Sequence, residues 1–322
     1  MIHRRQLLQG IGSGVIAAAY PMAARAQERL TTVTIGFAPG GPGEVLGRRI
    51  AEAMRAPLGH NVIVANRPGA AGMLAAIGLR NAPADGSQLI FGPPGIVTIN
   101  PLVYKRLQYD PNEIEPIAQV CEFSFAFAVK KDHPAKDLKQ FVEWSKANPK
   151  DASFGTVALG SIPHFVCYRL GRESGFAFQS VGYKGAKEIV NDMLGGTLPS
   201  GINIVSAFSA EHKAGTVRVL AVTGSKRSNA LPDVPTFAEQ GFPNIVAHES
   251  FGFFAPKGIP AQEADRIFQA AQQAIQAPEV RQLMALNDFE PLARNSADYK
   301  RLLQSSIDKW APLIRASGFK AE

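Results

Sequence analysis

Short runs of apolar residues alternate along the chain with longer segments in which apolar residues recur every three to four positions. The short runs are typical of buried strands, and the longer segments are typical of amphipathic helices. In the first third, expected strands at 33–37, 62–65 and 89–91 alternate with expected helices at 44–56 and 70–81. This β–α–β order predicts a mainly parallel sheet with helices on both faces.

The same alternation returns in the middle of the chain and then gives way to helices. Expected strands are 125–129, a strand starting at 153, 178–181, 202–204, 217–222 and 251–255. Expected helices are 138–147, 163–173, 186–194, 262–276, 278–287 and 296–316. Two α/β units with a helical tail predict two lobes around a cleft, and ligands of open parallel sheets bind beyond the carboxyl ends of the strands.

Composition narrows the class of protein. The 322 residues predict roughly two domains, and 46% hydrophobic with 19% charged residues supports sizeable cores. The net charge is +7, but the lysines and arginines are scattered along the chain. This pattern argues against a nucleic-acid partner. Six histidines without close His-x-x-x-His spacing and two cysteines predict neither a metal nor a cofactor. Cys121 and Cys167 could pair or remain two buried thiols.

Residues 1–26 have the pattern of an export signal. Arg4 and Arg5 precede an apolar run at 7–20, and Ala24-Arg25-Ala26 is an A-x-A cleavage site. The run is shorter than the ~20 residues that span a bilayer, and no lipobox cysteine follows it. We therefore expect cleavage after Ala26 and a soluble periplasmic protein. The sequence around the arginine pair also resembles a twin-arginine signal, so the export route stays open.

A glycine-rich segment joins the first expected strand to the first expected helix. It reads Phe37-Ala38-Pro39-Gly40-Gly41-Pro42-Gly43-Glu44, with Arg48 in the helix. Helix-start amides and the helix dipole favour a carboxylate or phosphate. The segment lacks the Gly-Lys-Ser/Thr of a P-loop and the spacing G-x-G-x-x-G. An anion site and a plain turn are equally supported by the residues alone.

A second strand-to-helix segment runs from Phe154 to His164. Ser161 is placed to cap the helix, and exposed amides with the hydroxyls of Thr156 and Ser161 could bind a polar ligand end. A catalytic Ser161–His164 pair is disfavoured because no G-x-S-x-G elbow surrounds the serine. We expect instead that His164 holds the loop. A third segment, 181–186, carries Lys184, which is either a cleft charge or a solvated lysine.

Many short motifs occur in order along the whole chain. They are Phe37–Gly41 with Arg48, Asn66–Gly72 (N-R-P-G-A-A-G), Pro83–Gly86, Asn100–Tyr104, Tyr109–Pro111, Gly155–Thr156, Gly160–His164, Tyr183–Gly185, Leu220–Thr223, Lys226–Ser228, Leu231–Thr236 and Glu239–Gly241. Together they resemble the periplasmic substrate-binding proteins of tripartite tricarboxylate transporters, the Bug family.

The resemblance implies an α/β, type II-like Venus-flytrap fold whose chain crosses twice between lobes. Lobe 1 would comprise 27–124 and 251–322, and lobe 2 would comprise 125–250. It implies capture of a small carboxylate, delivery to membrane permease subunits, a monomer and no enzymatic activity. The ligand-binding residues would be Phe37, Ala38, Pro39, Gly40, Gly41, Gly43, Glu44, Thr156, Gly160, Ser161, His164 and Lys184. A periplasmic sensor and an exported hydrolase or isomerase using Ser161 and His164 are the alternatives.

The chain departs from the family pattern at a few positions. Glu44 stands where the family usually has Asp, and Gly43 stands where it has Ser or Thr. Pro199 replaces an acid, Ser250 replaces an aromatic residue, and 92–95 (Gly-Pro-Pro-Gly) is stiffer than the usual serine-rich stretch. We expect these differences to affect the choice of ligand rather than the fold.

Overall fold

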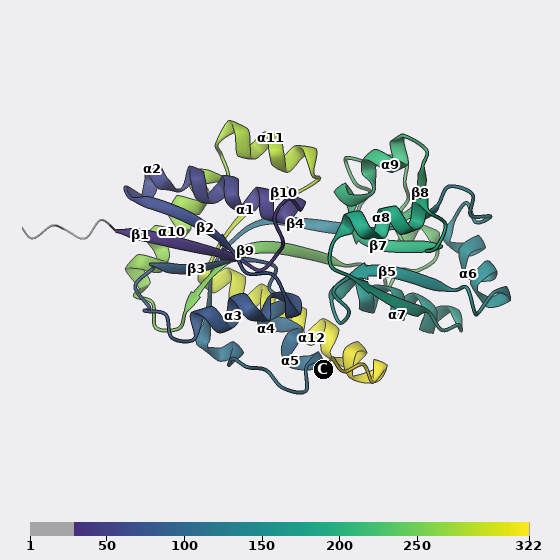
Figure 1. Ribbon diagram of the computed structural model, residues 1–322, viewed down its shortest axis with the longest axis horizontal. Coiled ribbons are helices and arrows are strands. Elements are labelled where there is room, and N and C mark those ends of the chain that lie inside the picture. The colour runs from purple at the N-terminus through teal and green to yellow at the C-terminus, as the bar shows by residue number, and fades with distance from the viewer. Residues whose placement is uncertain (1–28, 322) are drawn as a thin grey trace, which may run out of the picture.

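A computed structural model describes residues 29–321 of the protein. The expected signal peptide, its cleavage site after Ala26 and the expected mature start at Gln27 lie outside the described residues. Two lobes are visible in Figure 1, each built on its own part of a continuous β-sheet.

Each lobe contains three parallel strands followed by an antiparallel neighbour. In lobe 1 the order is β2 (Asn61–Asn66), β1 (Leu30–Ile35), β3 (Gln88–Gly92), β9 (His248–Pro256), β4 (Ile114–Lys130) and β10 (Glu290–Asn295). In lobe 2 the order is β6 (Gln179–Tyr183), β5 (Ser153–Val157), β7 (Ser200–Ile204), β4 and β8 (Val217–Val222). The expectation of a mainly parallel sheet is therefore wrong: β4 and β9 pair antiparallel with every strand beside them.

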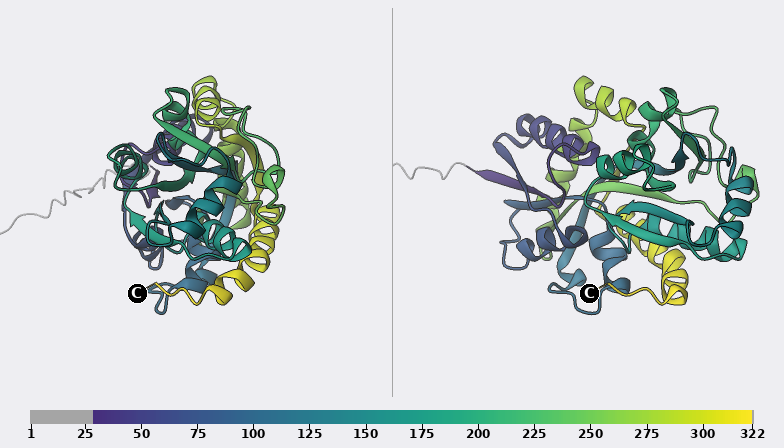
Figure 2. Two further views of the ribbon diagram at one scale, coloured as in Figure 1. Left: turned by 90° about the vertical axis from the view of Figure 1, so that its right-hand side faces the viewer. Right: turned by 45° about the vertical axis from the view of Figure 1, so that its right-hand side comes forward.

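Strand β4 is 17 residues long and belongs to both lobes. Its residues up to Ser124 pair with β9, and from Phe125 onward it pairs with β7 and β8. Figures 1 and 2 show β4 and β9 running together from one lobe to the other. The sequence predicted only the second half of β4. The first half carries the polar Gln119, fully buried, whose side-chain oxygen accepts a 2.6 Å hydrogen bond from Arg294 of β10.

Helices cover both faces of the two sheet parts. The α-helices are α1 (Pro42–Ala53), α2 (Arg55–Leu58), α3 (Met73–Leu79), α4 (Gly95–Thr98), α5 (Asn100–Val103), α6 (Leu138–Ala147), α7 (Ile162–Ser174), α8 (Ala186–Leu194), α9 (Ser209–Lys213), α10 (Ala261–Ala274), α11 (Pro278–Leu286) and α12 (Ser296–Ser317). The described residues also form four short 3-10 helices, η1 (Ala70–Gly72), η2 (Pro111–Glu113), η3 (Val205–Ala207) and η4 (Ala238–Gln240).

The two faces of β9 pack against different helices. Phe251 and Phe253 lie on the face that carries α1, where their rings pack on Phe91 at centroid distances of 5.6 and 5.1 Å. On the other face, Tyr299 of α12 packs on Phe254. This alternation fixes the register of the connecting strand, because a slip by one residue would expose every one of these rings.

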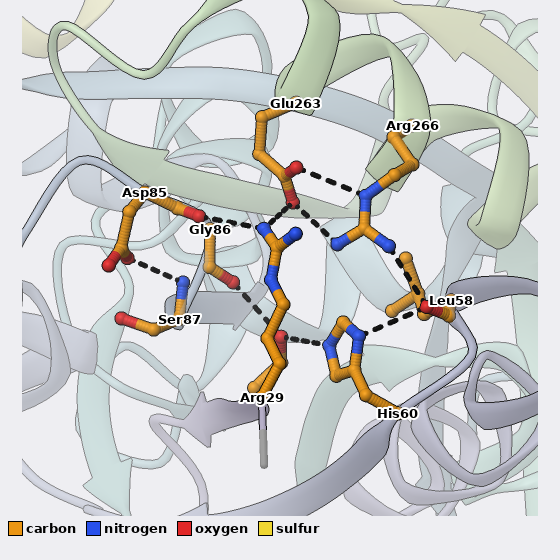
Figure 3. Close-up of polar contacts among 9 residues, drawn as sticks. Arg29, Leu58, His60, Asp85, Gly86, Ser87, Glu263 and Arg266 are labelled. Carbon is orange, nitrogen blue, oxygen red and sulfur yellow. Dashed lines mark hydrogen bonds and ion pairs between the residues drawn. The ribbon is translucent and has the colours of Figure 1, made fainter. Parts of the chain in front are cut away.

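A polar network lies at the amino ends of the parallel strands of lobe 1 (Figure 3). Glu263 of α10 binds Arg29 at 2.6 Å and Arg266 at 2.9 Å. Arg266 also donates to the carbonyl of Leu58, to which His60 is hydrogen-bonded. The network ties α10 to the start of β1 and the end of α2, at the edge of lobe 1 opposite the carboxyl ends of its parallel strands.

The C-terminal segment reaches across to lobe 2. The hydroxyl of Tyr168 in α7 donates to the carbonyl of Ala316, and the amide of Ala321 donates to the carbonyl of Val103. The Phe319 ring packs on His164 at 4.7 Å between centroids. The tail therefore lies between α5 and α7.

The two cysteines are far from reactive environments. Cys121 and Cys167 are both free and fully buried. Burial raises the pKa of the Cys121 thiol to about 12 and raises the pKa of Cys167 as well. Of the two alternatives that the sequence left open, the structure has two isolated thiols.

Candidate functional site

The first loop, residues 36–41, leaves the carboxyl end of β1 and enters α1. Ala38, Pro39 and Gly40 are exposed, while the Phe37 ring rests edge-on against Phe251. Gly40 has a φ of +92°, a left-handed conformation that favours glycine. The loop therefore projects its backbone into solvent from an anchored aromatic base.

A buried carboxylate holds this loop in shape. Glu44 accepts a 3.0 Å hydrogen bond from the amide of Gly40 and two, at 3.0 and 2.6 Å, from the guanidinium of Arg48. Asn66 at the end of β2 donates to Glu44 and to the carbonyl of Phe37. Burial opposes ionisation of Glu44, but these hydrogen bonds and the Arg48 charge outweigh it and lower its pKa.

The role of Glu44 changes the expectation for the loop. The amide of Gly40 is occupied by Glu44, so it is not available to a ligand in this arrangement. Arg48 balances the charge of Glu44 and thereby supports the loop. Asn66 was visible in the sequence only as part of a motif, and its position at a strand end was the signal that could have placed it here.

The start of α1 supplies amides for an anion. The first intrahelical bond runs from the amide of Val45 to the carbonyl of Gly41, at 3.0 Å. The preceding amides, of Gly43 and Glu44, have no intrahelical acceptor. Gly41, at the N-cap, has no side chain that could occupy them. With the helix dipole, this geometry favours a carboxylate.

Gly43 is required by packing. A Cβ at this position would come within 2.5 Å of the Phe251 ring. That ring is itself enclosed by Phe91, Phe123 and Phe289 at centroid distances of 4.7 to 5.6 Å. Phe251 thus fills the space that a Ser or Thr at 43 would need.

The second loop, residues 158–161, follows β5 and leads into α7. His164 in the first turn of α7 accepts a 3.1 Å hydrogen bond at Nδ1 from the amide of Gly160, as expected of a residue that holds the loop. The side chain is buried, and desolvation lowers its pKa to about 4. An imidazole that accepts at Nδ1 is neutral with its proton on Nε2. Gly160 has a φ of +86° and packs against Phe319 and Val103.

The hydroxyls of the second loop differ from the expectation. Ser161 occupies the N-cap of α7, yet its Oγ donates to the carbonyl of Val157 at 3.2 Å rather than capping the helix. The expected cap is therefore wrong. Thr156 is completely buried, and its Oγ1 has no hydrogen-bond partner among the described residues.

Ser161 and His164 are both engaged elsewhere. The serine hydroxyl is bonded to Val157 and the imidazole Nδ1 to the Gly160 amide, so neither activates the other. The geometry offers no nucleophile–base pair at this loop.

The remaining sequence candidates lie at different depths. Lys184 is exposed after β6, and its amide donates to Glu188 at 3.0 Å. Ser250 is buried against Tyr299 at 3.2 Å, on the face of β9 that carries α12. The exchange at Ser250 is thus a packing feature of β9, on the face away from the first loop.

A pocket of about 420 Å³ lies between the lobes, apart from both loops. It is bounded by 122–124 of β4, 224–229 of lobe 2, and the segment from α11 to β10. Ser228 donates to Asp288 at 2.6 Å, and Lys226 pairs with Glu290 at 3.4 Å across it. No residue of either loop lines this pocket.

Within residues 29–321, no group of three or more His, Cys, Asp or Glu side chains is arranged to hold a metal ion. In the same range, no helix has both the length and the apolar content needed to cross a bilayer.

Comparison with known proteins places the chain. Residues 46–319 match the family model described as "Tripartite tricarboxylate transporter family receptor". The solved structure of periplasmic binding protein BugD is 28% identical, with a TM-score of 0.82, and covers 92% of this chain and 99% of its own. MatC from Rhodopseudomonas palustris, solved with bound malate, is 26% identical with a TM-score of 0.80, over 89% of this chain and 99% of its own.

Another R. palustris protein, Rpa4515, was solved with adipate. It is 27% identical with a TM-score of 0.84, over 92% of this chain and 99% of its own. These are solute-binding proteins rather than enzymes, and their two-lobed fold is the fold described above. The chain belongs to the tripartite tricarboxylate transporter receptor family, also called the Bug family, and is a solute-binding protein.

Proposed function

We propose that this receptor binds a small carboxylate between its lobes, with the first loop on one side and the second loop on the other. The observation that carries the proposal is the start of α1, where two amides without intrahelical acceptors lie beside a loop held rigid by Glu44. An anion can bind such amides without any net side-chain charge. The proposed contacts are those predicted from the sequence, with the Gly40 amide excluded because Glu44 occupies it.

Malate and adipate in two relatives support a carboxylate as ligand for this chain. The family description supports delivery to a membrane permease. We propose a periplasmic monomer, with the signal peptide removed after Ala26, because a receptor of this kind must open and close freely.

Closure would move two bodies about the connecting strands. We propose 27–124 with 251–322 as lobe 1 and 125–250 as lobe 2. The change of β4 partners between Ser124 and Phe125 supports the first boundary. A ligand held first by one lobe would shift the population toward the closed form by adding contacts to the other.

Thermal unfolding of residues 27–322 with free acids and their methyl esters tests the proposal. Protein that has been unfolded, dialysed and refolded would exclude carried-over ligand. An acid at ~100 times its Kd should stabilise the fold by about 2.7 kcal/mol, and its ester should not. If no acid from three to eight carbons shifts the unfolding temperature, the proposal is wrong.

Lys184 provides a finer test of the second lobe. Lys184→Ala should weaken binding of the acid a few-fold if the ammonium faces the ligand. Lys187→Ala is a matched control, since Lys187 is an exposed lysine of the neighbouring helix α8. Equal binding by the two variants would remove Lys184 from the site.

A further inference from the structure

Glu249 of β9 lies on the same face of the sheet as the base of the first loop. It pairs with Phe123 of β4, and strand alternation puts it on the side of Phe251. Phe251 packs against Phe37 and lies directly under Gly43. Its neighbour Ser250 points the other way, to Tyr299. Glu249 therefore lies two residues before Phe251 on β9, on the same face of the sheet and on the side toward lobe 2.

Glu249 also lies beyond the end of its neighbouring strand. The pairing of β3 with β9 ends at Gly92 opposite Gly252, so Glu249 lies three positions beyond the last β3 partner. Strand order in lobe 1 reverses at β1, with β2 on one side and β3 on the other. Ligands of open α/β sheets bind at the carboxyl ends of the strands at such a switch point. Glu249 reaches this edge from the antiparallel strand.

The carboxyl group of Glu249 has no partner among the described residues. Other acids of the molecule do have partners: Glu44 binds Arg48, Glu115 binds Lys300 and Ser296, and Glu122 on the paired strand binds His248. Glu249 is half-buried, so solvent still reaches it, yet the surrounding protein desolvates it and raises its pKa to about 8. The titratable group beside it on the other face is Tyr299, which carries no positive charge. The side chain is therefore crowded by protein yet accessible enough to meet a donor group of a ligand.

We propose that Glu249 accepts a hydrogen bond from a hydroxyl or ammonium group of the bound carboxylate. The ligand is then a hydroxy acid or an amino acid rather than an unsubstituted acid. This inference rests on the proposed function, because the amides at the start of α1 take the carboxylate itself. Glu249 selects among acids through the donor group next to that carboxylate, and the ligand supplies the partner that the protein lacks.

The inference is tested by binding measurements with matched triads of acids. Each triad holds an unsubstituted mono- or dicarboxylic acid of three to six carbons with its 2-hydroxy and 2-amino derivatives, titrated calorimetrically into ligand-free protein. In at least one triad a substituted acid should bind about tenfold or more tightly than the unsubstituted acid. Glu249→Leu should abolish that preference. Glu249→Gln should retain it for a hydroxy acid and lose it for an amino acid, which distinguishes the two donors.

The outcomes separate this inference from the proposed function. If acids bind but the unsubstituted member is equal or better, or if Glu249→Leu keeps the wild-type preference, carboxylate capture stands and the role of Glu249 is wrong. If no acid of any triad binds, both are wrong.

A measurement without ligand provides a second test. Because an unpartnered carboxyl group destabilises a fold, Glu249→Leu should raise the unfolding temperature of the empty protein by about 2 °C or more. Glu115→Leu on the paired strand β4 is the control, and it should lower the temperature because it breaks contacts with Lys300 and Ser296. An unfolding temperature that falls in Glu249→Leu would show that Glu249 has a structural partner, and would overturn the inference.

Discussion

In the first loop the buried carboxylate of Glu44, paired with Arg48, fixes the backbone, whereas in the second loop the uncharged imidazole of His164 does so. Both side chains sit in the first turn of a helix that follows a parallel strand, and both accept a hydrogen bond from a glycine four residues earlier. The supporting side chain thus occupies the same position in the two loops, but it is a charged carboxylate in one and a neutral imidazole in the other.

The two supporting side chains have in common that neither adds a free positive charge to its loop. Glu44 is neutralised by Arg48, and His164 is neutral, so neither loop presents net charge from its supporting side chain. In the proposed site, attraction for a carboxylate would come from amides and helix dipoles, whose strength depends on loop geometry. The two supporting side chains would then act on binding through that geometry.

The largest expected difference between the two supporting side chains, Glu44 and His164, is in how their contributions to stability respond to acid. The pKa of His164 is about 4 in the folded protein against 6.5 for a free imidazole, so the unfolded chain binds the extra proton between those values. Stability from His164 is therefore complete above pH 6.5 and is lost as pH falls toward 4, by about 3 kcal/mol in total. In urea titrations from pH 7 to 4, His164→Asn should show a shallower decline than the wild type.

Other histidines with lowered pKa values contribute to the decline in both proteins, so the difference between the two curves is the readout. Parallel curves would mean that His164 titrates normally in the folded state. Glu44 acts in a lower window, since its pKa is reduced and its contribution is lost only as pH falls below about 4.5.

Removing the charged support should cost about 2 kcal/mol or somewhat more. Glu44→Ala leaves the Gly40 amide without its acceptor, removes one of the two acceptors of the Asn66 amide, and leaves the Arg48 charge without its carboxylate. Arg48→Ala should cost less, because the Arg48 side chain is 41% exposed and water can replace part of its contact. Chemical denaturation measures both, and an equal loss in the two variants would contradict the assignment of Glu44 as the central group.

Gly43 offers a compensating pair of changes. Gly43→Ser should destabilise the protein by about 1 to 2 kcal/mol, because its Cβ would lie 2.5 Å from the confined Phe251 ring. In the background Phe251→Leu the same change should cost clearly less. A double-mutant cycle of unfolding free energies checks this, and strict additivity would show that the two residues do not compete for space.

The smallest effect is expected at the second helix start. Ser161→Ala should change stability by about 0.5 kcal/mol, because the hydroxyl bonds a half-buried carbonyl and does not cap α7. A loss near that of Glu44→Ala would indicate that the second loop depends on its hydroxyl as the first depends on its carboxylate.

The periodicity of apolar residues was sufficient to predict elements whose buried face can be recognised within their own sequence. Helices α6 and α8 and strand β8 have the bounds predicted from the sequence. The first half of β4 and all of β10 were missed, because Gln119 and Arg294 satisfy each other across 175 positions. The sequence around either residue alone does not reveal that the two side chains meet.

The candidate site shows the same division. The sequence predicted the two loops and the holding role of His164. It did not predict that Glu44 occupies the Gly40 amide, because this depends on the side-chain conformation within one turn. Nor could it place Glu249, whose significance depends on where β3 ends beside β9.

The network of Arg29, Glu263 and Arg266 has a practical consequence for handling the protein. It anchors the start of β1 at the outer pole of lobe 1, and the strand runs from there toward the first loop. A resin, a sensor chip or a fluorescent fusion joined ahead of Arg29 would pull on this pole alone. The protein could then be immobilised by its leading end while the lobe-connecting strands bend without hindrance.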